Sequence, residues 1–118
     1  MINWRNDIDI FLHRDPVDFR KAINGLSVIV QDQMQCSPFT PALFVFCNKN
    51  RSQLKVLYWD DTGFALWQKR LEKDKFKWPR KHSETTVQLS HEQWCWLLRG
   101  FDLNQIKPHQ ALIFNALN

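Results

Sequence analysis

The sequence has little of what most catalytic and metal-binding sites require. It holds three glycines in 118 residues, and neither G-x-G-x-x-G, a P-loop nor G-x-S-x-G occurs in it. Its three cysteines, Cys36, Cys47 and Cys95, lack C-x-x-C spacing, and the four histidines show no ligand spacing with them. These absences argue against a disulfide framework, a zinc site and a nucleophilic enzyme, and they favour a reducing compartment.

Long apolar runs are missing too. No run approaches the roughly 18 residues of a membrane span, and the start MINWRNDIDIF has no basic segment followed by an apolar core. We therefore expect a cytoplasmic protein that does not enter the membrane. With 44% hydrophobic residues, the chain can bury one core, so we expect a single domain over 1–118. Its tail, 104–118, is expected to lie against the sheet or against a partner chain.

The net charge of +4 is concentrated in the middle of the chain. Residues 41–81 carry ten basic and four acidic groups, a balance of +6, whereas 1–40 and 82–118 each have a balance of −1. Such a local excess is typical of a surface that binds a polyanion, although lysines also keep a sheet soluble. The candidate nucleic-acid-binding residues are the seven basic ones of 69–81: Lys69, Arg70, Lys73, Lys75, Lys77, Arg80 and Lys81.

Aromatic residues are interleaved with these cations. In an extended strand, Lys75 and Lys77 share one face while Phe76 and Trp78 share the other. That alternation favours buried rings beneath a charged surface. Nucleic-acid contact, where it occurs, is then made mainly by the charges rather than by stacking of exposed rings such as Trp67.

The first third of the chain predicts a strand and a helix. Residues 8–14 alternate as a strand does, Asp15 is a candidate N-cap, and Pro16 suits the first helical position. Apolar residues follow at helical spacing, which predicts a helix over 16–34 with one buried stripe: Phe19, Ile23, Leu26 and Val30.

The remainder predicts a β-meander and a second helix. Apolar runs beginning at 42, 53 and 63 predict antiparallel hairpins, with Asp61-Thr62 as the second turn and Gly63 at a positive φ. KFKWPR, residues 75–80, predicts an edge strand that Pro79 limits. After a short strand, a helix is predicted at 91–99, between a Ser90–Gln93 capping box and Gly100. The expected class is α/β of the α+β kind: an antiparallel meander of about four or five strands, one longer N-terminal helix and one short C-terminal helix.

Acidic residues near the second turn invite comparison with two-metal sites. Asp60 and Asp61, with Glu72 and Asp74 downstream, would have to converge around metals roughly 3.5–4 Å apart. The D-D-T-G stretch favours a turn instead, because Asp hydrogen-bonds its own backbone there. We expect no catalytic residue, no metal and no cofactor.

Four segments together resemble a known family. DFRKAINGLSVIV, LFVFCNKNRSQLKVLYWDDTGFALWQKRLEKDKFKWP, VQLSHEQWCWLLRGFD and IKPHQAL occur in the order, and nearly at the spacing, of the small accessory protein of IS66-type insertion sequences. This is the TnpB or Orf2 family, unrelated to the RNA-guided nuclease called TnpB. The resemblance covers about residues 8–113. The sequence departs from it at Cys47, where the family often has arginine, and at Asp74, where it often has glycine.

The resemblance implies an accessory role in transposition, beside a separate transposase that carries the acidic catalytic site. The family has no assigned active site, so the resemblance implies no catalytic residue in this chain. Two mechanisms therefore stay open: binding of DNA through a basic sheet surface, or docking on the transposase as a protein scaffold without DNA contact. The expected partners are the transposase and other proteins of the same element, with DNA as a further candidate; the oligomeric state does not follow from the sequence.

Overall fold

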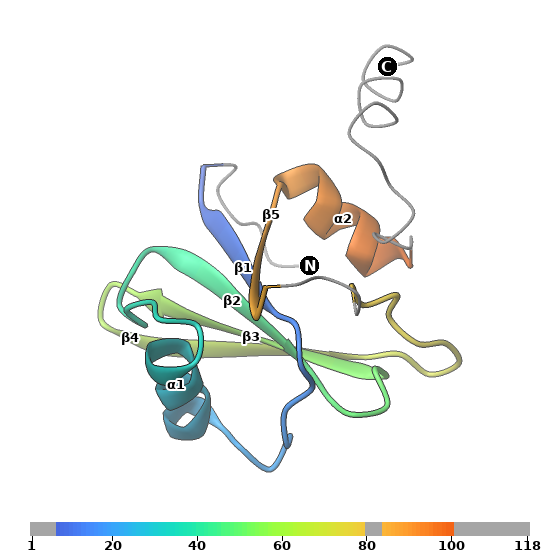
Figure 1. The fold of residues 1–118 in the computed structure, drawn as a ribbon, viewed down its shortest axis with the longest axis horizontal. Coiled ribbons are helices and arrows are strands. Elements are labelled where there is room, and N and C mark those ends of the chain that lie inside the picture. Colours follow the sequence, from blue (N-terminus) through green and yellow to red (C-terminus); the bar gives the residue numbers. More distant parts are fainter. Residues whose placement is uncertain (1–6, 80–83, 101–118) are drawn as a thin grey trace.

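The computed structural model describes residues 7–79 and 84–100 (Figure 1). Within these ranges the chain forms five strands and two helices. In chain order they are β1 (Asp9–His13), α1 (Ile23–Asp32), β2 (Ala42–Cys47), β3 (Gln53–Asp60), β4 (Gly63–Arg70), β5 (Thr86–Leu89) and α2 (His91–Arg99). The predicted α+β class, with an N-terminal and a C-terminal helix, is confirmed.

The strands form one mixed sheet in the order β4-β3-β2-β1-β5. β2, β3 and β4 make the predicted antiparallel meander, and β5 is antiparallel to β1. One pairing departs from a pure meander, because β1 runs parallel to β2. The connection between them contains α1, and a crossover of this kind returns the chain to the end of the sheet where the first strand began.

The two helices cover opposite faces of the sheet (Figure 1). Every residue of β2 is buried, because its side chains alternate between two cores. Leu43 and Val45 pack with Trp94 and Leu97 of α2, whereas Phe44 and Phe46 pack with residues of α1. The central strand thus belongs to both layers of the fold.

Helix α1 is shorter than the predicted helix over 16–34. It begins at Ile23 after Ala22, whose side chain makes no capping bond, so the predicted N-cap at Asp15 is wrong. Contacts elsewhere in the fold determine the path of residues 14–22. Val17 N–H donates to the Cys47 carbonyl, and the buried Lys55 amine donates to the carbonyls of Phe19 and Lys21. Residues 16–22 accordingly form turn and coil rather than helix, with the carbonyls of Phe19 and Lys21 directed toward Lys55 of β3.

Helix α2 occupies the predicted residues. The hydroxyl of Ser90 accepts from Gln93 N–H, and the Gln93 side chain accepts from Ser90 N–H in return. Gly100 follows at a φ of 95°, a conformation that glycine adopts without a steric penalty. Local chemistry therefore determines both ends of this helix.

The turn between β3 and β4 differs in one detail. Asp61, not Gly63, takes the positive φ, at 49°. Asp tolerates this left-handed conformation better than most residues, because its short side chain bonds the local backbone.

The predicted strand at 75–80 is wrong. Residues 75–79 form no strand, and Arg80 lies outside the described residues. Trp78 N–H donates to the carbonyl of Phe76, which bends the chain out of an extended path. The predicted alternation of exposure nevertheless holds, since Phe76 and Trp78 are buried while Lys75 and Lys77 are exposed.

Candidate nucleic-acid interface

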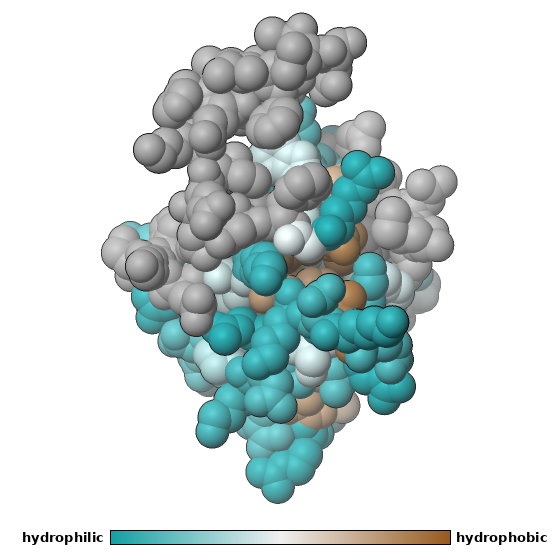
Figure 2. All heavy atoms as spheres, turned by 90° about the vertical axis from the view of Figure 1, so that its right-hand side faces the viewer, coloured by the Kyte–Doolittle hydropathy of each residue, from teal (hydrophilic) through white to brown (hydrophobic). Residues whose placement is uncertain are grey.

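The segment after β4 lies alongside the turn between β2 and β3. Leu71 N–H donates to the Ser52 carbonyl at 2.8 Å, and Phe76 N–H donates to the Arg51 carbonyl at 2.7 Å. Both segments lie at the right of Figure 1, and the face that they share is mostly hydrophilic with small apolar areas (Figure 2). The backbone thus joins two stretches that are rich in lysine and arginine.

Five cations gather at this end of the molecule. Lys73, Lys75 and Lys77 are exposed on the segment after β4, and the β2–β3 turn adds an exposed Lys49 and a half-buried Arg51. We call these five residues the basic end. Lys49 and Arg51 were not among the candidates from sequence. The sequence KNR between two predicted strands could have identified them, because a hairpin turn projects beyond the sheet.

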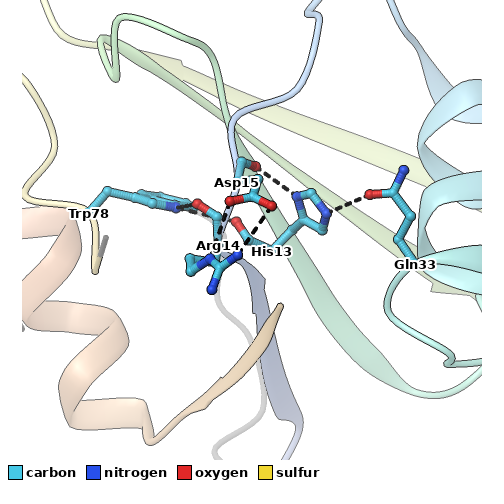
Figure 3. Close-up of polar contacts among 5 residues, drawn as sticks. All are labelled: His13, Arg14, Asp15, Gln33 and Trp78. Atoms are coloured by element: carbon cyan, nitrogen blue, oxygen red, sulfur yellow. Dashed lines mark hydrogen bonds and ion pairs between the residues drawn. The ribbon is translucent and has the colours of Figure 1, made fainter. Parts of the chain in front are cut away.

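Trp78 anchors the segment that carries Lys75 and Lys77. Its indole Nε1 donates to the backbone carbonyls of His13, at 3.2 Å, and Arg14, at 2.9 Å (Figure 3). The ring is 2% exposed. It is therefore a structural residue and offers no face on which a base could stack.

Two of the remaining candidates from sequence, Lys69 and Arg70, do not share one surface with the basic end. Lys69 and Arg70 are neighbours in β4, so their side chains point to opposite faces of the sheet. Lys69 Nζ lies 3.4 Å from the Leu98 carbonyl of α2, and Arg70 pairs with Glu72 at 3.1 Å. Arg80 and Lys81 lie outside the described residues, as does the tail 104–118.

A small hollow opens beside the anchored tryptophan. Its volume is about 110 Å³, and its lining includes Arg14, Lys49, Arg51 and Trp78. Asp15 lines it as well and pairs with Arg14 at 3.2 Å. Three cations thus surround a space of roughly the size of a phosphate group, with one carboxylate among them.

A buried histidine supports this corner of the fold. His13, 2% exposed, donates through Nδ1 to the Asp15 carbonyl at 2.7 Å, and its Nε2 lies 3.0 Å from the Gln33 side-chain oxygen (Figure 3). Gln33 follows α1 directly. The imidazole therefore links the end of β1 to the end of α1, and it positions the backbone carbonyls that accept from Trp78.

Two kinds of environment shift pKa values here. Hydrogen bonds from Arg20 lower the pKa of the exposed Asp18 carboxyl to about 2. Burial raises the pKa of the Cys47 thiol to about 12, and burial also raises that of Cys36. Cys47 therefore stays protonated at neutral pH, because a buried thiolate would lose its hydration.

The acidic residues compared with a metal site do not converge. Asp60 and Asp61 lie at one end of β4, whereas Glu72 and Asp74 follow its other end. Within 7–79 and 84–100, no three or more His, Cys, Asp or Glu side chains form a group that could hold a metal ion. Neither of the two helices in those ranges has the length and apolarity to cross a membrane.

A second surface feature lies at the opposite end of β3. Phe39, 58% exposed, packs against Trp59 and Phe64, with ring centroids 5.0 Å and 5.4 Å away. Trp59 and Phe64 are directly opposite each other in the β3–β4 hairpin, 5.0 Å apart. We call these three residues the aromatic cluster.

Comparison with known proteins adds a family assignment. A family model described as "IS66 Orf2 like protein" matches residues 8–108. The uncharacterized protein y4jC of Sinorhizobium fredii is 33% identical over 107 residues, which cover 91% of each chain. The uncharacterized protein y4hO of the same strain is 30% identical over 102 residues, 86% of this chain and 88% of the relative. No solved structure matches.

Proposed function

Because the chain belongs to the IS66 Orf2-like family of insertion-sequence proteins, we propose that it is a non-catalytic accessory protein of transposition that binds DNA through its basic end. It acts in the cytoplasm beside a separate transposase, which carries the catalytic site. The observation that supports DNA binding is the convergence of two segments that carry lysine and arginine on one hydrophilic face.

The chemistry of this end suits a phosphate backbone. Lysine and arginine side chains neutralise phosphates and release condensed counterions, which makes binding strong at low salt and independent of sequence. Phe76 and Trp78 anchor the segment through their hydrogen bonds, so the neighbouring Lys75 and Lys77 are presented on an ordered backbone. Arg80 and Lys81 continue this segment in the sequence, and Lys69 and Arg70 precede it.

The arrangement of the cations at the basic end suits several successive phosphates of a DNA backbone. In this proposal one phosphate of the DNA occupies the hollow beside Trp78, where the cations Arg14, Lys49 and Arg51 outnumber the Asp15 carboxylate. Lys75 and Lys77 contact the neighbouring phosphates of the DNA strand. Phosphate contacts position a protein on DNA without reading the bases. Recognition of the element's ends is therefore assigned to the transposase.

Fluorescence anisotropy with labelled duplex DNA at several salt concentrations tests this function. The double variant Lys75→Gln/Lys77→Gln removes two charges from the basic end. We expect it to weaken binding and to reduce the salt dependence, log K against log salt, by about 0.9 for each phosphate that the variant no longer neutralises. Terminal repeats of the element and a scrambled duplex are expected to bind alike.

A matched control separates a local effect from total charge. Val28 and Gln31 are exposed on α1, away from the basic end, so Val28→Glu/Gln31→Glu lowers the net charge by the same two units. We expect this control to keep the salt dependence of the unmodified protein. Equal weakening in both variants, or no binding at low salt, would refute a DNA-binding surface at the basic end.

The aromatic cluster favours a second candidate function, docking on the transposase without DNA contact. Aromatic residues, phenylalanine included, are enriched at protein interfaces, and Phe39 is the most exposed large apolar side chain of the described residues. Retention of the transposase on immobilised protein tests it. Phe39→Ala would abolish retention, whereas Val28→Ala, the control at another exposed apolar residue, would not.

A further inference from the structure

One edge of the sheet is long, apolar in part and accessible. β4 is the outermost strand on its side, and none of its eight residues is buried. Among residues 7–79 and 84–100, no strand pairs with its outer side. Unpaired N–H and C=O groups along such an edge form a template for another strand.

The hydrogen-bond pattern identifies which residues present these groups. Leu71 N–H donates to the Ser52 carbonyl, in the same register that pairs Arg70 with Gln53. Since bonded and non-bonded pairs alternate along an antiparallel ladder, odd-numbered residues of β4 bond to β3. The backbone groups that point outward therefore belong to Phe64, Leu66, Gln68 and Arg70.

The two ends of this edge carry opposite charges. The exposed Asp60 and Asp61 lie at the start of β4, and Lys69 and Arg70 lie at its end. Over eight strand residues the two ends are about 23 Å apart, well beyond the roughly 8 Å over which salt screens charges in solution. They cannot neutralise each other within one chain. Arg70 does pair with Glu72, but both side chains are mostly exposed, so this pair exchanges readily.

A second copy of the chain is complementary to this edge. In an antiparallel arrangement, the basic end of one β4 lies beside the acidic end of the other, and a two-fold axis makes both contacts at once. We propose that two copies pair through their β4 edges around Ala65, which joins the two sheets into one of ten strands. This inference goes beyond the proposed function and does not depend on DNA binding.

The alternation limits the possible registers, because two outward-facing residues must be opposite each other. With the axis at Ala65, Phe64 of one copy lies opposite Leu66 of the other. Ala65 then faces Ala65 at the axis, where a small side chain allows close approach. Lys69 and Arg70 then extend past the β3–β4 turn of the second copy, which carries Asp61 and follows Asp60, the last residue of β3.

Sedimentation velocity over a range of protein concentrations tests the pairing, with proline variants at matched sites. Gln68→Pro removes an outward N–H that β3 does not use, and we expect it to yield a monomer. Gln88 is the matched site on β5, the strand at the opposite edge of the sheet. Arg14 N–H donates to the Thr85 carbonyl, so the odd-numbered residues of β5 bond to β1 and the Gln88 N–H points outward. Each glutamine also loses a comparable side-chain bond, to Gln53 or to Asp9. Gln88→Pro is therefore expected to remain a dimer.

Charge exchange tests the proposed partner. Lys69→Glu/Arg70→Glu makes both ends of the edge acidic, and Asp60→Lys/Asp61→Asn makes both basic; Asn tolerates the left-handed backbone at 61. Each variant alone should be monomeric, and an equimolar mixture should restore the dimer. Circular dichroism melts establish whether each variant is folded. If Lys69→Glu/Arg70→Glu does not fold, the comparison of Gln68→Pro with Gln88→Pro tests the proposal.

Three results would overturn the proposal. The first is a monomeric unmodified protein at every concentration tested. The second is a dimer that persists in Gln68→Pro. The third is a mixture of the two folded charge variants that stays monomeric.

Discussion

Trp78 donates its indole N–H to the backbone carbonyl of Arg14, at 2.9 Å, across 64 residues of sequence. Its second acceptor is the carbonyl of His13. This pair of bonds holds an irregular segment against the end of β1, and it gives Lys75 and Lys77 their position.

Replacing Trp78 with phenylalanine keeps an aromatic ring but removes the donor. The carbonyls of His13 and Arg14 then lose the bond from the indole, and removing the donor of a buried hydrogen bond costs about 1–3 kcal/mol. We expect the free energy of unfolding in urea to fall by about that amount. Trp59→Phe, at a half-exposed ring in the aromatic cluster, is the control and should change stability by less.

Replacing Lys55 with methionine tests the segment that leads into α1. The amine of Lys55 donates to the carbonyls of Phe19 and Lys21, at 3.0 and 2.9 Å, and lies 4.8 Å from the centre of the Phe19 ring. Methionine fills similar space without a donor, so we expect a decrease of about 1–3 kcal/mol in the free energy of unfolding in urea. Lys49→Met, at an exposed site, should be close to neutral, and equal effects would contradict a structural role for Lys55.

The three cysteines should react with iodoacetamide in a defined order. Cys95 is exposed, Cys36 is half-buried with a raised pKa, and the Cys47 thiol is buried with a pKa raised to about 12. Alkylation needs the thiolate, so at pH 8 we expect Cys95 to react first and Cys47 last, as followed by mass spectrometry. Above about pH 9 the unfolded state loses the Cys47 proton while the folded state keeps it. Stability should therefore fall as pH rises, and less so in Cys47→Ala.

Arg20→Ala tests the cause of the low pKa of Asp18. Hydrogen bonds from Arg20 lower that pKa from 3.8 to about 2, so it should return toward 3.8 when the guanidinium is removed. An NMR titration of the Asp18 side-chain carbon measures this directly. Because the folded state lowers the pKa of Asp18, the Asp18–Arg20 pair stabilises the folded state above pH 3.8. This stabilisation is lost as the pH falls toward 2. An unchanged pKa in Arg20→Ala would assign the shift to another group.

Sequence patterns predicted most of the sheet and all of α2, because these depend on neighbours in the chain. Apolar runs separated by turn residues locate β3 and β4, and the Ser90–Gln93 capping box with Gly100 locates both ends of α2. The burial of Phe76 and Trp78 followed from the alternation of rings and lysines along 75–78. The family assignment likewise came from residues that are contiguous in sequence.

Contacts between distant residues account for what the sequence did not predict. The early start of the predicted N-terminal helix failed because Lys55, more than 30 positions later, bonds the carbonyls of Phe19 and Lys21. The predicted strand at 75–80 failed because Trp78 reaches back to β1. Lys49 and Arg51 joined the basic end only through backbone bonds to residues 71 and 76.

The central position of β1 in the sheet means that its two edges pair at different times while the ribosome synthesises the chain. β1 lies between β2 and β5, and β5 begins at Thr86. While the chain emerges from the ribosome, β1 can pair with β2 as soon as residue 47 is free, but its other side waits for almost 40 further residues. During that interval Ile10 and Leu12 of β1, which are fully buried in the finished fold, lie on a strand with one unpaired edge. An unpaired edge with apolar residues can associate with other nascent chains, so completion of β5 closes a route to aggregation.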